Sequence, residues 1–434
     1  MDFVRSIGRW TMTALVINCI IGSGIFAVPG ELNRLLGRVS PFAMIFAAIA
    51  MAITMACITE VASQFVEPGG SYLYVRTAFG RFMGMQIGWF HLLAVAAAVA
   101  VCANLFMDYL VTFLPWALNR WERSLGMALL IAIPAAVNYR GVRSGANLST
   151  VMTIAKLAPL ALLIVFGLAR FAHHPHIIHA SELASPGWSN WVRAVALLIF
   201  PLGGWEDSLI PTGEVREPRR TIPFALGTGL VACTAIYMLL QFITVATVGP
   251  NATERSLAEA GSVLLGHDGA ALVAIAIMVT SYGWLSADLL NAPRLAYSLA
   301  AEGDFPTMLA RIHPRFHTPA LAILAYAFTG WTLAVSGTFL FALALSAGSM
   351  MIYYAGMSAS LIRLRTLRPN ADAFRIPFGP VLSIVAVAIA LGLMTGLTRR
   401  ELLLMCVTAL LATANWLWAR RRSVQSESKV HAPA

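Results

Sequence analysis

The chain has 434 residues, of which 59% are hydrophobic and only 12% are charged. An average soluble domain is about one quarter charged and under half apolar, so this composition excludes a disordered chain and argues against a soluble enzyme. The 30 Lys and Arg outnumber the 20 Asp and Glu, which gives a net charge of +10. Because the arginines lie between apolar runs, they suit orientation in a bilayer, and we expect no nucleic-acid partner.

A helix that crosses a bilayer needs roughly 20 mostly apolar residues. Twelve such runs follow one another, at about residues 10–36, 39–65, 82–114, 124–140, 147–171, 190–214, 221–249, 267–301, 319–336, 338–366, 379–397 and 400–420. We therefore predict an all-α integral membrane protein with twelve transmembrane helices. Loops on the side of the termini hold 20 Lys and Arg and the opposite loops hold nine, which places both termini in the cytoplasm and the chain in the cytoplasmic (inner) membrane.

Cysteine and histidine do not indicate a metal centre. All five cysteines lie inside apolar runs and no CxxC pair occurs. The outer loop at about 171–190 holds His173, His174, His176 and His179. Histidine suits zinc and copper, but we favour a solvated, His-rich loop over a metal site. We expect no metal and no cofactor.

Two predicted spans carry helix-breaking residues in their middle. The first span contains Gly22-Ser23-Gly24, and the sixth contains Pro201-Leu202-Gly203-Gly204. In a helix interior glycine costs about 1 kcal/mol and proline about 3 kcal/mol. In hydrocarbon, the freed backbone groups cost several kcal/mol more unless a partner satisfies them. Broken backbone at this depth indicates a polar ligand or a water-filled cavity.

The two breaks fall at equivalent positions if the chain contains two five-span repeats of inverted orientation, which is typical of transporters with a midplane site. Half-helix N-termini after each break would offer N–H groups to a carboxylate, and half-helix C-termini would offer carbonyls to an ammonium. The pattern therefore predicts a site for a zwitterion. Glycine used for close helix packing is the alternative, and it suits an isolated motif better than paired breaks.

Four motifs together resemble the amino acid–polyamine–organocation (APC) superfamily, specifically bacterial amino acid permeases. They are the run Gly22–Phe26 and the segments 60–74, 214–223 and 291–306, which end the second, sixth and eighth spans. The resemblance covers about residues 8–420. It implies alternating access and a leucine-transporter-like fold, with inverted repeats at about 10–171 and 190–366, two extra helices at about 379–420 and a short cytoplasmic tail at 421–434.

The resemblance also implies a substrate site around the two breaks. The substrate carboxylate would meet the N–H groups of Ser23 and Gly24. The ammonium would meet carbonyls near Ile20, Phe200 and Gly203, with the Phe200 ring as an aromatic gate. The other residues of this expected site are Gly22, Gly204, Trp205 and Trp284.

Ionisable residues at membrane depth are expensive and are candidates for coupling. By the resemblance, Lys156 in span 5 stands where sodium sits in other members, so transport would be sodium-independent. Lys156 would either exchange a proton or serve as a fixed cation between spans 1 and 5. Glu206 and Asp207 follow the second break, and Glu206 stands where some members carry a proton-sensing glutamate. Stabilisation of the carboxylates by a helix N-terminus is the alternative.

The expected pocket lining, which includes Ser346, Gly348 and Ser349 of span 10, is mostly small and apolar with aromatic faces, and it favours a neutral amino acid of medium or large size. The alternative is a cationic substrate that faces Glu206, Asp207 or Asp288, because aromatic rings can also hold cations. We expect a secondary transporter, by proton symport or alternatively by exchange of amino acids or polyamines. A non-transporting membrane sensor is a third reading. No HExxH or GxSxG motif indicates an enzyme. The expected partners are the amino acid, protons and lipid, with the chain as monomer or homodimer.

Overall fold

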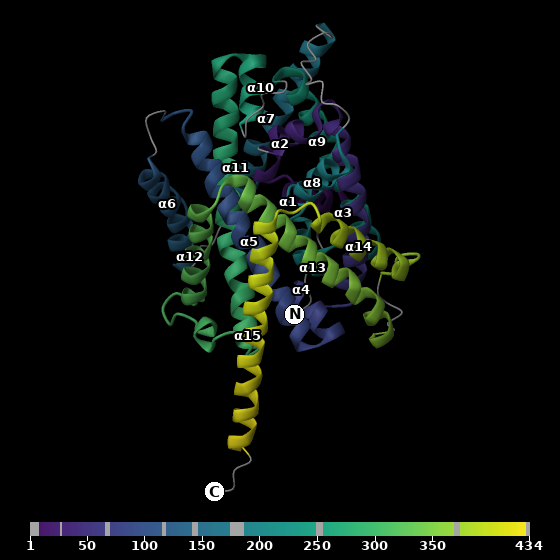
Figure 1. The fold of residues 1–434 in the computed structure, drawn as a ribbon, viewed down its shortest axis with the longest axis vertical. Helices are drawn as coiled ribbons and strands as arrows, with labels where there is room; N and C mark the ends of the chain where they lie inside the picture. The colour runs from purple at the N-terminus through teal and green to yellow at the C-terminus, as the bar shows by residue number, and fades with distance from the viewer. Residues whose placement is uncertain are drawn as a thin grey trace.

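The computed structural model describes residues 8–26, 28–65, 70–114, 119–140, 146–173, 186–248, 255–368 and 374–430. It describes only the backbone at 146–156, 210–214, 267 and 422–430. Within these ranges the regular structure consists of α-helices and short 3-10 helices (Figure 1). The predicted all-helical class is thus confirmed for the described part of the chain.

The elements follow one another as α1 (Arg9–Ile20), η1 (Ser23–Phe26), α2 (Val28–Leu36), η2 (Gly37–Val39), α3 (Ser40–Ala62), α4 (Gly70–Phe79), α5 (Arg81–Leu110), α6 (Arg120–Tyr139), α7 (Ala146–His173), α8 (Trp188–Leu198), η3 (Trp205–Glu214), α9 (Pro218–Val248), α10 (Ser256–Leu265), α11 (His267–Ala301), η5 (Thr307–Ala310), α12 (Ala320–Ser336), α13 (Phe339–Leu367), α14 (Gly379–Met394) and α15 (Arg399–Val430). Each of the twelve predicted runs contains a helix, and the first and sixth runs are each divided. The short helices α4 and α10 were not predicted.

Six described segments are long and apolar enough to cross a bilayer: Val28–Ala62, Arg81–Leu110, Pro218–Val248, Asp268–Ala301, Phe339–Leu367 and Arg399–Arg421. Four further apolar segments are shorter: Leu157–His173, Ser256–Leu265, Ala320–Ser336 and Gly379–Met394. These lengths support an integral membrane protein. The number twelve and the inverted repeat remain predictions.

Helix α5 lies inside the bundle and contacts α4, α11, α12, α13 and α15 (Figure 1). Its middle consists of small residues, and Ala97 and Ala100 are completely buried. Small side chains let helix backbones approach closely in a membrane, where packing rather than water drives association. The position of α5 brings its neighbours α11 and α13 beside the broken helices.

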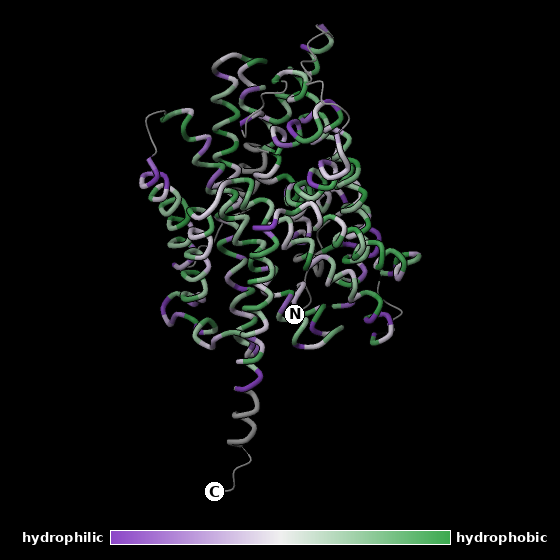
Figure 2. Tube along the Cα trace, in the orientation of Figure 1, coloured by the Kyte–Doolittle hydropathy of each residue, from purple (hydrophilic) through white to green (hydrophobic). Residues whose placement is uncertain are grey.

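Large apolar side chains cover much of the outer surface. Ile384 of α14 and Leu403 and Leu410 of α15 are each more than 60% exposed. Figure 2 shows these helices as mainly hydrophobic along their length, with hydrophilic segments gathered near helix ends. Soluble monomers rarely expose apolar patches of such extent, so these faces suit lipid.

A buried ion pair joins α3 to α13 at one end of the bundle. Nε and one terminal nitrogen of Arg365 donate to the two oxygens of Glu60, at 2.6 and 2.8 Å, and the Ile376 N–H donates to the same carboxylate at 2.8 Å. The Glu60 side chain is only 1% exposed, whereas that of Arg365 is 23% exposed. The pair fixes the end of the second predicted span against the tenth.

We expect Arg365→Ala to lower the free energy of unfolding by about 3 kcal/mol, because it leaves the buried Glu60 carboxylate without its cation. Thermal unfolding in detergent measures this effect. Arg363→Ala is the matched control, since Arg363 lies two residues away on α13, is exposed and makes no ion pair within the described part of the chain. Equal melting temperatures for the two variants would contradict the prediction.

A second polar cluster closes the same end of the bundle between α4, α5 and the end of α11. Asp304 accepts hydrogen bonds from Arg81 Nε at 2.5 Å and from the Tyr72 hydroxyl, and Arg76 pairs with Glu302 at 2.8 Å. Burial above all, and then the hydrogen bond to Asp304, raise the pKa of the Tyr72 phenol. Tyr72 therefore stays protonated and remains a donor at physiological pH.

Candidate functional site

The first break interrupts the first predicted span where the sequence indicates it. Helix α1 ends at Ile20, and the Gly22 N–H turns back to the Ile20 carbonyl at 2.8 Å. The chain then continues as η1, whose first two residues, Ser23 and Gly24, are buried. At the start of a helix no preceding turn supplies carbonyls for the N–H groups. The N–H groups of Ser23 and Gly24 therefore have no acceptor from a preceding turn of η1 itself.

The second break separates α8, which ends at Leu198, from η3, which begins at Trp205. Gly204 has a φ of +83°, a conformation that L-residues with side chains rarely adopt. A Cβ on Gly204 would also lie 2.9 Å from the Cys19 carbonyl oxygen. Both the backbone conformation and the approach of α1 therefore require glycine here.

The two breaks contact each other directly. A Cβ placed on Gly24 would lie 2.7 and 2.9 Å from two atoms of the Phe200 ring. Tyr237 of α9 is completely buried, and its hydroxyl lies 3.1 Å from both the Ile20 and the Pro201 carbonyl oxygens. One phenol thus serves as the shared donor for both broken segments. Tyr237 is not among the predicted site residues, although a tyrosine in an apolar span requires a polar partner.

We expect Tyr237→Phe to lower the free energy of unfolding by about 1–3 kcal/mol, because the Pro201 carbonyl loses its donor while remaining buried. Thermal unfolding in detergent tests this expectation, and Tyr297→Phe is the control because the described part of the chain shows no hydrogen bond from that hydroxyl. A melting temperature unchanged from wild type would show that the shared bond does not hold the breaks together.

Glu206 lies at the start of η3 and accepts two hydrogen bonds from neighbouring tyrosines of α13. The Tyr353 hydroxyl lies 2.6 Å from one carboxylate oxygen and the Tyr354 hydroxyl 2.8 Å from the other. His91 of α5 stacks on Tyr353, with ring centroids 4.7 Å apart, and its Nδ1 lies 2.7 Å from the Ser71 hydroxyl. A hydrogen-bonded and stacked chain therefore runs from α4 through α5 and α13 to the second break.

The other predicted residues at the second break differ in exposure. Trp205 is completely buried and stacks on Tyr354, with centroids 5.8 Å apart. Its indole N–H has no acceptor among the described residues. Asp207 is exposed and makes no ion pair within the described ranges. Trp284 of α11 faces the first break, with its Cδ1 4.0 Å from the position of a Cβ on Gly22.

Two sequence expectations for the lining of the site are wrong. A Cβ on Gly348 would meet Met405 and Leu397, so this position faces α15 and the segment before it rather than the breaks. Ser346 donates its hydroxyl to the Ala94 carbonyl at 2.8 Å, so it joins α13 to α5 instead of lining a cavity. Both errors arise because the sequence alone does not show which helices pack against each face of α13.

Lys156 lies in α7, but its side chain is outside the described part of the chain. The structure therefore places its backbone within a helix that contacts α9 and α11. His174, His176 and His179 also lie outside the described residues. Within the described residues, no group of three or more His, Cys, Asp and Glu side chains could hold a metal ion.

Asp288 of α11 is a further partly buried carboxylate, with the Tyr326 hydroxyl of α12 donating to it at 2.5 Å. Two residues before Asp288, the Ser286 carbonyl accepts a hydrogen bond from the side-chain amide of Asn138 of α6 at 3.3 Å. These bonds connect the outer helices α6 and α12 to α11, which carries Trp284 at the first break.

A helical membrane protein in which two broken helices meet at their breaks has the architecture of a secondary transporter. A family described as "Amino acid permease" matches residues 7–418 of the sequence. The chain therefore belongs to the amino acid permease family, and it is a permease rather than an enzyme.

Named relatives agree with this family. The serine/threonine exchanger of Bacillus subtilis (strain 168) is 30% identical over 336 residues, which cover 74% of this chain and 74% of that protein. An uncharacterized transporter of Mycobacterium tuberculosis (strain ATCC 25618 / H37Rv) is 28% identical and covers 90% of this chain and 87% of its own length. The mouse (Mus musculus) large neutral amino acids transporter small subunit 2 is 28% identical over 74% of this chain and 62% of its own.

Proposed function

We propose that this chain is a sodium-independent secondary transporter that moves amino acids across the cytoplasmic membrane by alternating access, coupled to protons. The proposal includes twelve spans, two inverted five-helix repeats and cytoplasmic termini. The observation that carries it is the direct contact between the two breaks, where Gly24 packs against Phe200 and Tyr237 binds both segments. Paired breaks bring helix N-terminal N–H groups and free carbonyls to one place, which is what a zwitterion requires.

In this proposal the substrate carboxylate binds the N–H groups of Ser23 and Gly24 at the start of η1. The ammonium binds carbonyls at the second break, at Phe200 and Gly203, although the Phe200 carbonyl already accepts one hydrogen bond from the Gly203 N–H at 3.1 Å. The Ile20 carbonyl contributes less, because it already accepts hydrogen bonds from the Gly22 N–H and the Tyr237 hydroxyl. Gly22, Gly204 and Trp284 shape the space between the two segments.

We propose a neutral amino acid as the substrate. The buried Trp205 N–H, which has no acceptor within the described ranges, favours a side chain with a hydrogen-bond acceptor such as a hydroxyl. The names of two relatives, a serine/threonine exchanger and a glutamate/serine transporter of Bacillus subtilis (strain 168), are compatible with such a substrate. The exposed Asp207 is the feature that would instead suit a cationic amino acid or a polyamine.

Coupling is assigned in this proposal to Glu206, with Asp207 and Lys156 as further candidates. The Glu206 carboxylate accepts hydrogen bonds from two tyrosine hydroxyls and forms no ion pair with a described residue, so these dipoles balance its charge. Such a carboxylate can take up and release a proton without breaking an ion pair. Exchange without net proton movement is the second candidate, and the 30% identity to a named exchanger favours it.

Uptake into proteoliposomes tests the proposal. Twenty amino acids and simple polyamines are each assayed with an inward proton gradient, with a sodium gradient, and with the same solute preloaded. Accumulation that needs protons but not sodium supports proton symport. Uptake only with internal solute shows exchange instead, and sodium-dependent uptake contradicts the role given to Lys156. Absence of uptake and counterflow for every solute would favour a non-transporting sensor.

We expect Lys156→Ala to reduce transport at least about tenfold, because an ionisable residue within a predicted span is costly and supplies a charge that alanine cannot replace. Initial rates of uptake, normalised to reconstituted protein, measure the effect. Lys156→Arg keeps the charge and is the matched variant: its activity distinguishes a fixed cation from a titrating one. Wild-type rates in Lys156→Ala would remove this residue from the mechanism.

A further inference from the structure

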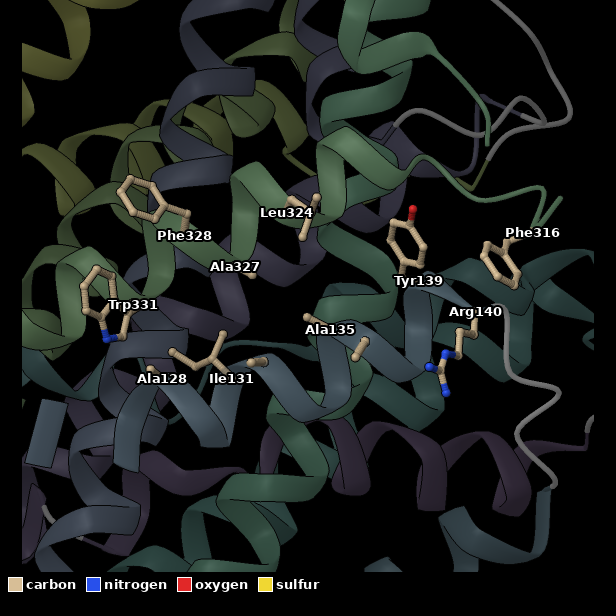
Figure 3. A pocket seen from close by; sticks show the side chains of 12 residues that line it. Ala128, Ile131, Ala135, Tyr139, Arg140, Phe316, Leu324, Ala327, Phe328 and Trp331 are labelled. Atoms are coloured by element: carbon tan, nitrogen blue, oxygen red, sulfur yellow. The ribbon is translucent and has the colours of Figure 1, made fainter. Parts of the chain in front are cut away.

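An apolar groove lies between α6 and α12, at the edge of the bundle and away from the breaks. These two helices run side by side in Figure 1, and their facing surfaces form an open groove of about 630 Å³ (Figure 3). The floor is hollow because α6 presents alanines, including the exposed Ala132 and Ala136. Leu324, Phe328 and Trp331 of α12 form the opposite wall. This volume lies in the range of ligand-binding sites, about 300–1,000 Å³.

One end of the groove is basic. Arg140 and Phe316 lie at this end, and Phe328 and Trp331 lie at the other (Figure 3). The Arg315 guanidinium stacks on the Phe316 ring at 5.5 Å, which brings a second cation to the same end. Arg140 and Arg315 are both exposed, and neither makes an ion pair with a carboxylate in the described ranges. The charges are therefore available to an external anion.

The apolar end is held in a fixed shape. The Trp331 indole N–H donates to the Ser124 carbonyl of α6 at 3.2 Å. At the basic end, the Thr318 hydroxyl donates to the Tyr139 carbonyl at 2.8 Å, and the Tyr139 ring lies 5.6 Å from that of Phe316. Hydrogen bonds therefore connect α6 to α12 and to the segment before it, one at each end of the groove. The groove is thus part of the fold and does not require a partner to form it.

We propose that this groove binds one anionic phospholipid, with an acyl chain along the alanine floor and the phosphate at Arg140 and Arg315. The combination of an apolar groove and two guanidinium groups at one end, neither of which has an ion pair among the described residues, matches an amphiphile with a single anionic head group. Basic pockets between transmembrane helices are known to bind such head groups, and guanidinium binds phosphate in bidentate geometry. The site is separate from the breaks and does not depend on the proposed transport function.

Native mass spectrometry of the full chain in detergent tests this proposal, with dioleoyl phosphatidylglycerol and dioleoyl phosphatidylcholine as probes. We expect the double variant Arg140→Gln/Arg315→Gln to weaken phosphatidylglycerol binding by about tenfold or more, since each cation near a membrane surface strengthens binding by a factor of about five. Binding of phosphatidylcholine should be weak and unchanged. Glycerol phosphate should not displace the lipid, because it lacks the acyl chain.

A second variant separates the groove from the charges. Ala132→Leu/Ala136→Leu fills the floor at exposed positions, so it should fold normally, keep both arginines and still weaken phosphatidylglycerol binding. Arg363→Gln, an exposed arginine on α13, is the matched control and should bind like wild type. The proposal is overturned if both groove variants bind phosphatidylglycerol normally or if Arg363→Gln loses it equally. It is also overturned if the groove variants change only the dimer fraction, because the groove would then be an interface between two copies.

Discussion

Gly24→Leu is expected to abolish substrate binding, with an affinity loss of more than about hundredfold. Even a methyl group on Gly24 would lie 2.7 Å from the Phe200 ring, and leucine would occupy the space in front of the Ser23 and Gly24 N–H groups. Overpacking costs typically 1–3 kcal/mol, and each lost hydrogen bond to a charged carboxylate costs about 1.5–3 kcal/mol. Binding is measured by substrate-dependent thermal stabilisation of the purified chain.

Two companion variants make this result interpretable. Gly392→Leu places the same side chain in a helix where nothing lies within 4 Å of the added Cβ, so its binding should remain at the wild-type level. Gly24→Ala should give an intermediate loss, because Phe200 is a side chain that can rotate. A folded Gly24→Leu protein with wild-type affinity would show that the substrate does not bind at the paired breaks.

Glu206→Gln is expected to reduce proton-driven accumulation of the substrate by about tenfold or more. Counterflow of the substrate should persist in this variant. The amide is close in shape to the carboxylate but cannot change its protonation state. It can still fit between Tyr353 and Tyr354, because its oxygen accepts from one hydroxyl and its NH₂ group donates to the other. Uptake with an imposed proton gradient, compared with counterflow at equal pH, measures the two activities separately.

Tyr354→Phe is the matched control for Glu206→Gln. It removes one of the two hydrogen bonds and leaves the carboxylate in place, so accumulation should continue at a lower rate. Loss of accumulation in both variants would indicate that the site needs its geometry rather than a titrating group. Normal accumulation in Glu206→Gln would transfer the coupling role to another carboxylate, with Asp207 and Asp288 as the nearest candidates in sequence and fold.

The breaks could be predicted because their causes are local. Glycine and proline lower helix stability wherever they occur, so Gly22, Gly24, Pro201 and Gly204 identify the interruptions without knowledge of the fold. The apolar runs likewise predict the long helices. Helix α4 was missed because it has only 10 residues, too few to be recognised as a span.

The contacts that complete the site could not be predicted, because they join residues far apart in the sequence. Tyr237 is 217 residues from Ile20, and Tyr353 is 147 residues from Glu206. The pattern of α13 is apolar on all sides, so periodicity does not show which side faces the breaks. Successive helical residues point about 100° apart, and this angle decides that Gly348 faces α15 while Tyr353 and Tyr354 reach Glu206.

The shared phenol of Tyr237 also limits how the two broken segments can move. A hydroxyl has one hydrogen, so it can bind the Ile20 and Pro201 carbonyls together only while the two segments remain adjacent. Any step that separates them must give up one of these bonds, and a net hydrogen bond costs only about 0.5–1.5 kcal/mol. This cost is close to the thermal energy. Tyr237 therefore aligns the two broken segments while they are adjacent. It adds little to the free-energy barrier for separating them.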